Sequence, residues 1–136
     1  MRLLIDTNIF LEILLAQEQA SNAMALLTEV EAHEFYISDF SLHSIGVLLF
    51  RRGHFGAFKD FLDDMVNGVG LTVISLDVTD LDTVGDNAQK FRLDFDDAYQ
   101  YAVAEKLNLT IASLDKDFDR TARGRKTLAD ILNKVD

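Results

Sequence analysis

The stretch Leu3-Leu4-Ile5-Asp6-Thr7-Asn8 decides the fold, because it joins a short apolar run to a carboxylate at the point where a strand would end. Residues 2–5 suit a buried parallel strand, which needs apolar side chains on both faces. In an open α/β sheet, ligands bind in the crevice outside the carboxyl ends of the strands. Asp6 is therefore placed where a binding site would form, although an aspartate that only caps the next helix is the alternative.

Strands and helices alternate along the rest of the chain, and this order predicts an α/β fold with a mainly parallel sheet covered on both faces. The expected strands are 2–5, 35–37, 71–74 and 110–112. The expected helices begin near Asn8, run from about Ser21 to Val30, from Phe40 to Phe50 and from Phe55 to Met65, cover 79–91 and 96–107, and end with one that starts at Thr127. Because no linker or repeat interrupts this order, we expect a single domain over residues 1–136.

Composition limits the kinds of site that the chain can carry. The 136 residues include no cysteine and three histidines, which excludes disulfides and thiolate zinc sites and argues against an all-imidazole site. Any metal would be held by oxygen. No apolar run approaches the roughly 20 residues that span a bilayer, and no secretory leader is recognisable, so we expect no membrane contact and a cytoplasmic location.

Charge is distributed unevenly. The 13 basic and 23 acidic residues give a formal net charge of −10, which repels nucleic acid at long range. A short stretch nevertheless gathers several basic residues directly after Asp115 and predicts a local cationic patch, with an exposed, solubilising loop as the alternative. Its basic residues are Lys116, Arg120, Arg123, Arg125 and Lys126.

Acidic residues recur beside two further predicted element ends. Asp97 lies in Asp94-Phe95-Asp96-Asp97-Ala98, at the start of an expected helix, where the helix dipole alone could explain a carboxylate. Asp115 and Asp117 follow the expected strand 110–112. Acids that arrive from three segments at one edge of a sheet can meet, and clustered carboxylates suit Mg²⁺ or Mn²⁺.

With these motifs, the chain resembles the PIN-domain family and is most similar to its small VapC-type ribonucleases. Three stretches match three of the family's four motif regions in order and spacing: Ile5-Asp6-Thr7-Asn8, the Asp97-Ala98 helix start, and Ser113-Leu114-Asp115-Lys116-Asp117-Phe118. The resemblance covers essentially the whole chain and implies a three-layer α/β/α fold.

The resemblance also implies Mg²⁺- or Mn²⁺-dependent hydrolysis of RNA phosphodiester bonds. Asp6, Asp97 and Asp115 would be both catalytic residues and metal ligands. Asp117 would be a further catalytic carboxylate that reaches the metal directly or through water. These assignments agree with the physical requirement that carboxylates fix the cation close to the phosphate.

Further residues would support that site. Asn8, Ser113 and Asp96 would orient the ligands or water. Arg120 and Arg123 would hold RNA phosphates as charges or forks and would not read the sequence.

One departure from the family pattern lies in the helix after the second strand. The family places a glutamate early in this helix, and Ser44 stands at that position here. Serine brings no negative charge, so metal affinity could fall unless His43, Asp39 or Glu12 compensates. For His43 itself we expect a partly buried packing role.

Two other functions compete with the nuclease. A phosphatase of the haloacid-dehalogenase type would need an aspartate two residues after Asp6, where this chain has Asn8. A PIN-like binding module that has lost catalysis would account for Ser44. If the resemblance to VapC-type toxins holds, RNA is the substrate, and a small antitoxin helix in an apolar groove or a second copy of the chain are the protein partners to consider.

Overall fold

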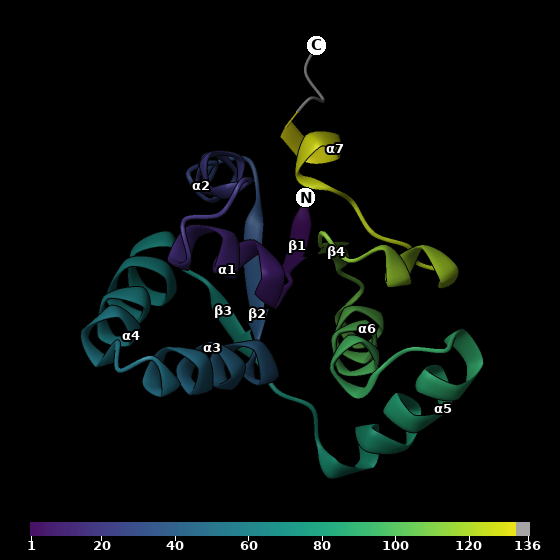
Figure 1. Cartoon of the computed structure of the whole chain (residues 1–136). Coiled ribbons are helices and arrows are strands. Elements are labelled where there is room, and N and C mark those ends of the chain that lie inside the picture. The colour runs from purple at the N-terminus through teal and green to yellow at the C-terminus, as the bar shows by residue number, and fades with distance from the viewer. Residues whose placement is uncertain (133–136) are drawn as a thin grey trace.

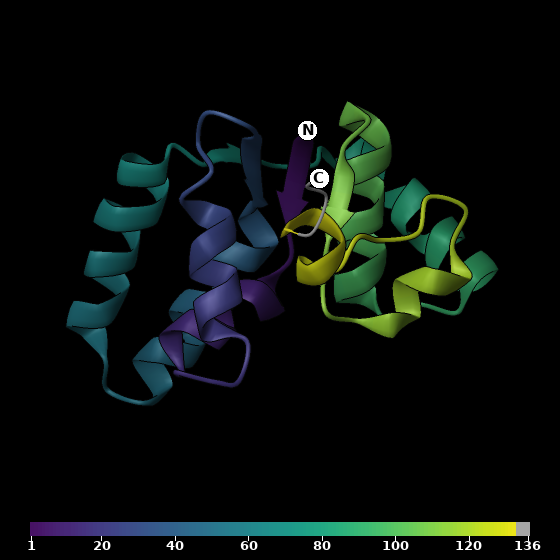
Figure 2. The ribbon, with the colours of Figure 1, turned by 90° about the horizontal axis from the view of Figure 1, so that it is seen from above.

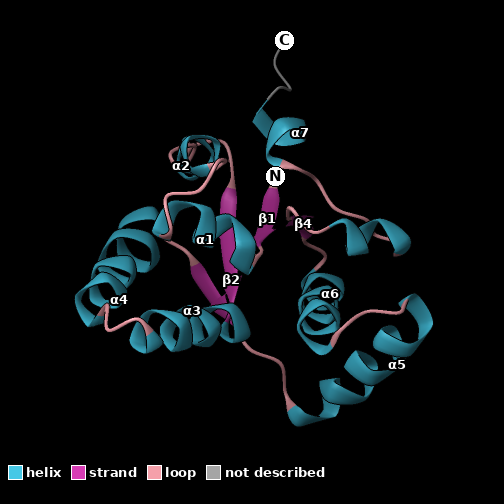
Figure 3. Ribbon diagram, in the orientation of Figure 1, coloured by secondary structure: helices cyan, strands magenta, loops and turns pink. Residues whose placement is uncertain are grey.

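The computed structural model describes residues 1–132 and places one parallel sheet at the centre of this part of the chain. Its strands are Arg2–Ile5 (β1), Glu34–Ser38 (β2), Thr72–Ile74 (β3) and Thr110–Ala112 (β4). They lie in the order β3-β2-β1-β4, and each neighbouring pair is parallel (Figure 3). All four predicted strands are confirmed.

The helices lie on the two faces of this sheet. They are Thr7–Leu14 (α1), Ala20–Leu27 (α2), Asp39–Arg51 (α3), Phe55–Phe61 (α4), Leu81–Phe91 (α5), Phe95–Leu107 (α6) and Leu128–Leu132 (α7). Figures 1 and 2 show α1 to α4 on one side of the strands and α5 and α6 on the other. The three-layer α/β/α architecture is therefore confirmed. Across residues 1–132, no helix combines the length and the apolar character needed to cross a membrane.

The alternation of side chains along β1 explains the two layers. Leu3 and Ile5 are fully buried in the core under α1 to α4, whereas Leu4 is fully buried in the core under α5 and α6. Successive side chains of a strand point to opposite faces, so a strand between two helical layers must be apolar throughout. The apolar run 2–5 satisfies this requirement.

Strand order fixes where a ligand can bind. The chain moves outward from β1 to β2 and β3, and then returns to the opposite side of β1 to form β4. This reversal makes the crevice beyond the carboxyl ends of β1 and β4 the topological switch point, which is the usual ligand site of such sheets. Asp6 and Ser113 are the first residues after these two strands.

The outer edge of β4 is covered by the chain's own C-terminal segment. Lys126 donates its backbone N–H to the Ile111 carbonyl at 2.8 Å and accepts from the Ser113 N–H at 3.1 Å. Beyond this bridge, Thr127 and Asp130 form a capping box, with reciprocal bonds of 2.9 and 3.0 Å, and α7 follows at the end where a helix was predicted. The expected single domain includes residues 133–136, which lie outside the described residues.

Some predicted details differ in the structure. Val30 was expected in the second helix, but α2 ends at Leu27 and Val30 is 46% exposed. The predicted helix from Phe55 to Met65 changes at Leu62 into a π-helical segment that continues to Val69. Its apolar stripe is only partly core, because Phe61 is buried whereas Phe55 is 58% exposed. Spacing along one helix cannot tell which turns the neighbouring elements will cover.

Phe10 tests how strongly α1 is anchored beside Asp6. Its ring is fully buried and packs edge-on against Phe61, with centroids 5.3 Å apart. We expect Phe10→Ala to lower the free energy of unfolding by about 3–5 kcal/mol, because it removes a buried ring and leaves a cavity. Phe55→Ala, the matched exposed control, should cost less than about 1.5 kcal/mol. Urea denaturation measures both, and equal losses would contradict this description of the core.

Candidate metal centre

Asp6 lies at the end of β1 and is almost completely buried, with 5% exposed. Its Oδ1 accepts from the Thr7 backbone N–H at 2.9 Å and from Gln100 Nε2 at 2.8 Å, and its Oδ2 accepts from Ser113 Oγ at 2.6 Å. Asp6 is also the N-cap of α1. The capping role and the site role are thus compatible, because the same carboxylate also faces donors from α6 and from the end of β4.

Asp97 lies in α6, in one of the two helical layers, and lines the same pocket as Asp6. It lies in the first turn of α6 and is 6% exposed, although this position of a helix is often exposed to solvent. Asp115 follows β4 and begins the short 3₁₀ turn Lys116–Arg120, where its Oδ1 accepts from the Asp117 N–H at 2.8 Å. This turn brings Asp117 back toward Asp115.

Three of the predicted acids come together in the part of the chain that the structure describes. Asp97, Asp115 and Asp117 each offer a carboxylate oxygen, and these oxygens lie within 4.8 Å of one another. This donor set is all oxygen and fits a hard divalent cation such as Mg²⁺ or Mn²⁺. Asp6 is outside this group of three, but it lines the pocket next to it.

That pocket has a volume of about 220 Å³ and is called the acidic pocket below. Its lining residues are Asp6, Thr7, Asn8, Leu11, Phe40, Asp96, Asp97, Gln100 and Asp115. Larger hollows lie elsewhere on the surface, but the carboxylate cluster does not line them. We identify the site by its chemistry and its position at the switch point, since size alone does not distinguish a functional pocket.

Crowding of carboxylates changes their protonation. The pKa of Asp97 is raised from its ordinary 3.8 to about 8, first because burial penalises the charged form, then through its hydrogen bond with Asp115 and repulsion by it, with smaller repulsion from Asp6 and Asp96. Burial also raises the pKa of Asp6, against the lowering effect of its hydrogen bonds from Ser113, Gln100 and Thr7. A bound cation would relieve this repulsion, which supports the fit of the donor set.

The residues expected to orient the site connect its segments. Ser113 is fully buried, donates to Asp6, and accepts from Asn8 Nδ2 at 3.3 Å and from the Asp115 N–H at 2.9 Å. Asn8 in turn accepts from the Leu114 N–H at 3.3 Å. Asp96 is exposed at the pocket rim. Asn8 and Ser113 thus tie α1 to the segment that follows β4.

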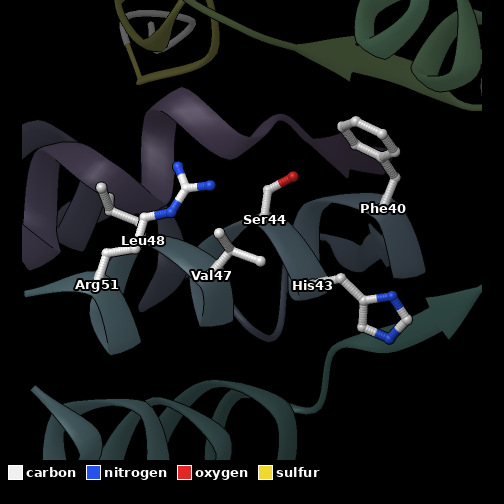
Figure 4. A pocket seen from close by; sticks show the side chains of 6 residues that line it. All are labelled: Phe40, His43, Ser44, Val47, Leu48 and Arg51. Carbon is white, nitrogen blue, oxygen red and sulfur yellow. The ribbon is translucent and has the colours of Figure 1, made fainter. Parts of the chain in front are cut away.

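Ser44 lies beside the acidic pocket and does not line it. It lines a hollow of about 510 Å³ along α3, which shares Phe40 with the acidic pocket (Figure 4). His43 was expected to be partly buried, and this prediction is wrong: its ring is exposed and points away from Ser44 in Figure 4. The i and i+1 positions of a helix face different directions, so a residue next to Ser44 need not share its surroundings.

The other two residues considered as substitutes for the absent glutamate have partners away from the cluster. Asp39 Oδ1 accepts from Tyr99 Oη at 2.7 Å. Glu12 Oε1 accepts from the Gln19 backbone N–H at 2.6 Å. Neither lines the acidic pocket.

The two arginines proposed for RNA have different surroundings. Arg120 Nη1 donates to Asp117 Oδ1 at 2.9 Å, and the rest of its guanidinium donates to the carbonyls of Phe91 and Arg92. Arg120 therefore holds one acid of the cluster. Arg123 is exposed, donates to Asn108 Oδ1 at 2.6 Å, and lines a separate hollow with Arg125.

Sequence reasoning missed Gln100 and Ser41. Gln100 is 2% exposed, and its Nε2 donates to both Asp6 Oδ1 and Ser41 Oγ at 2.8 Å. The sequence did contain a signal for Gln100, because it follows Asp97 by three residues and therefore lies on the same face of the helix. Ser41 also accepts from Thr7 Oγ1 at 2.7 Å. No local pattern predicted that contact, because Ser41 comes from a different element.

Comparison with known families agrees with this geometry. The family model of the PIN domain matches residues 3–124. The chain belongs to the PIN-domain family. No curated protein sequence matches this PIN domain.

Solved structures with the same fold include VapC-type toxins and toxin–antitoxin complexes. A toxin–antitoxin complex from Klebsiella pneumoniae is 20% identical with a TM-score of 0.71, and the match covers 92% of this chain and 96% of that chain. VapBC2 from Rickettsia felis, bound to a promoter DNA fragment, is 16% identical with a TM-score of 0.72, and the match covers 93% of this chain and 98% of that chain. VapC20 of Mycobacterium tuberculosis, a toxin that cleaves the sarcin–ricin loop, is 18% identical with a TM-score of 0.72, and the match covers 89% of this chain and 95% of that chain.

The raised pKa of Asp97 predicts how metal-free stability depends on pH. Between its ordinary value of 3.8 and about 8, folded Asp97 binds more protons than the unfolded chain. The free energy of unfolding contributed by this group therefore falls as the pH rises through that window. Asp97→Asn cannot ionise, so its melting temperature should exceed that of the parent by a margin that grows from pH 5 to about pH 8.

Asp80→Asn is the matched control for this experiment. The pKa of Asp80 is lowered, chiefly by its hydrogen bond from Lys106, so its contribution is lost only as the pH falls through that lowered value. Asp80→Asn should show no growing advantage between pH 5 and about pH 8. Thermal melts in the presence of a chelator measure both variants, and a difference between Asp97→Asn and the parent that does not change with pH would contradict the assigned pKa.

Proposed function

We propose that this PIN domain is a Mg²⁺- or Mn²⁺-dependent ribonuclease that hydrolyses RNA phosphodiester bonds. The observation that carries the proposal is the set of Asp97, Asp115 and Asp117 oxygens within 4.8 Å of one another at the switch point of the sheet. The family and the toxin fold of its structural neighbours support the same function. When bound, a divalent cation supplies a nucleophilic water at neutral pH and offsets charge on the phosphate oxygens.

Residues of the chain would bind the cation and position its ligands. Asp97, Asp115 and Asp117 would hold the cation, and Asp6, which lines the acidic pocket, would be a further carboxylate ligand. Ser113 and Asn8 keep Asp6 and the segment after β4 in place through their hydrogen bonds. Because Asp6 and Asp97 are buried, water would screen their attraction to a bound cation less than at the surface.

We also propose that the protein is the toxin of a toxin–antitoxin pair. The solved structures with this fold include toxin–antitoxin complexes. Exposed aromatic side chains support a protein partner: Phe50 is 53% exposed, packs edge-on against Phe55, and lines an apolar hollow of about 500 Å³ with Val47 and Phe58. An amphipathic antitoxin helix could bury this surface.

A second candidate function is a PIN-like binding module without catalysis. Ser44 in place of a carboxylate favours it, since the nearby acids Asp39 and Glu12 do not replace the missing charge. RNA cleavage distinguishes the nuclease from the binding module. A binding module would hold RNA without cleaving it, whatever metal is added.

Asp115→Asn tests the nuclease directly. The substitution removes a charged ligand without changing side-chain volume, so Mn²⁺-dependent cleavage of mixed RNA should fall by more than roughly 100-fold while the fold persists. Asp119→Asn is the matched control, because Asp119 is exposed and pairs with Arg125 outside the cluster. Its activity should stay close to that of the parent. Full activity in Asp115→Asn would reject the site, and an inactive but RNA-binding parent would favour the binding module.

Arg123 tests the proposed contact with RNA phosphates. In a metal-free buffer that prevents cleavage, Arg123→Ala should weaken RNA binding and reduce the slope of log affinity against log salt by about 0.7 for each lost contact with single-stranded RNA. Arg52→Ala provides an exposed control at the end of α3. Fluorescence anisotropy measures both slopes. If the two variants have the same slope as the parent, the basic stretch serves solubility and not RNA binding.

A further inference from the structure

Gln100 leaves one buried oxygen without a hydrogen-bond partner. Among the buried side-chain polar atoms of the described residues, only Asn87 Nδ2 and Gln100 Oε1 lack one. Buried polar atoms are almost always paired, so each exception calls for an explanation. Gln100 is 2% exposed and lines the acidic pocket, whereas Asn87 does not.

The orientation of this amide follows from its partners. Nε2 lies 2.8 Å from Asp6 Oδ1 and 2.8 Å from Ser41 Oγ. Asp6 Oδ1 already accepts from the Thr7 backbone N–H and so behaves as an acceptor. The amide must therefore present Nε2 to Asp6, and Oε1 is left as the end without a donor.

The helix places Gln100 beside the acids. Gln100 follows Asp97 by three residues in α6, and residues three apart lie on the same helix face. Both side chains line the acidic pocket together with Asp6 and Asp115. No described residue donates a hydrogen bond to Gln100 Oε1.

A cation is the partner that can satisfy all these atoms together. Amide carbonyls are regular ligands of hard divalent cations, alongside carboxylates. A neutral oxygen has one advantage here, because it adds a ligand without adding a charge to carboxylates whose oxygens already lie within 4.8 Å of one another. The two donor bonds of Nε2 hold the amide in place before any cation arrives, which reduces the entropy lost on binding.

We propose that Gln100 Oε1 is a neutral oxygen ligand for the divalent cation of the acidic pocket. This inference rests on the proposed metal-dependent function for the identity of the cation. It adds a fixed, uncharged ligand from α6 to the carboxylates, and it gives Gln100 two roles, one for each end of its amide.

Two substitutions at this position separate the roles. Gln100→Met keeps the length of the side chain but removes both the donor and the oxygen, whereas Gln100→Glu removes the donor and keeps an oxygen. Mn²⁺ affinity can be measured from the electron paramagnetic resonance signal of free Mn²⁺, in about 1 M KCl, where the screening length of roughly 3 Å suppresses attraction by charges that do not touch the ion. We expect Gln100→Met to weaken Mn²⁺ binding by roughly 10–100-fold and Gln100→Glu to bind at least as tightly as the parent.

Matched controls separate this inference from the proposed function. Gln89→Met makes the same change at an exposed site on α5 and should leave the affinity unchanged. Asp115→Asn should weaken Mn²⁺ binding in any case. If Asp115→Asn binds Mn²⁺ like the parent, the metal site itself is wrong. If Asp115→Asn weakens binding but Gln100→Met does not, or if Met and Glu at position 100 weaken it equally, only the role of Gln100 is overturned.

A spectroscopic measurement covers the case in which Gln100→Met does not fold. The parent protein can be prepared with ¹³C at the side-chain carbonyl of glutamine, and Mn²⁺ electron–nuclear double resonance then reports whether such a carbon is bonded to a ligating oxygen. We expect a ¹³C coupling in the parent that is lost in labelled Gln100→Glu. Absence of the coupling in the parent would overturn the proposal.

Discussion

The buried carboxylate of Asp6 is the constraint on which the rest of this structure depends. A carboxylate that is 5% exposed must be surrounded by donors, since a buried charge without them would not remain ionised. Its donors come from Thr7 at the start of α1, Gln100 in α6 and Ser113 after β4. Ser41 extends the network into α3 through its bonds with Gln100 and Thr7. Both helical layers are thereby tied to one atom group at the end of β1.

The arrangement of the elements also explains how several negative charges can be gathered in one site of a small domain. The strand order brings the ends of β1 and β4 side by side, and α6 delivers Asp97 from one helical layer. Crowded acids destabilise the folded state, so they need neighbours that are well packed. The apolar interior on both faces of β1 provides that packing, and Arg120 offsets part of the charge on Asp117.

Sequence predicted the parts of this protein that depend on local pattern. The apolar runs gave all four strands, and the acids at strand and helix ends gave Asp6, Asp97, Asp115 and Asp117, which the fold brings to one region. What sequence could not give is contact between elements. The bond from Gln100 to Ser41 spans 59 positions, and Arg120 finds two carbonyls almost 30 positions earlier. The exposure of His43 likewise depends on what packs beside α3, which its own helix does not encode.

The backbone pairing of Lys126 has a consequence for how the molecule behaves among its own copies. β4 is the outermost strand on the side of the sheet that carries the site, and unpaired outer strands invite other chains to add to them. The two bonds that Lys126 makes with Ile111 and Ser113 occupy this edge with the chain's own backbone. A chain cut before residue 126 would present those groups to its neighbours, so we expect such a chain to associate with its own copies more readily than the parent does.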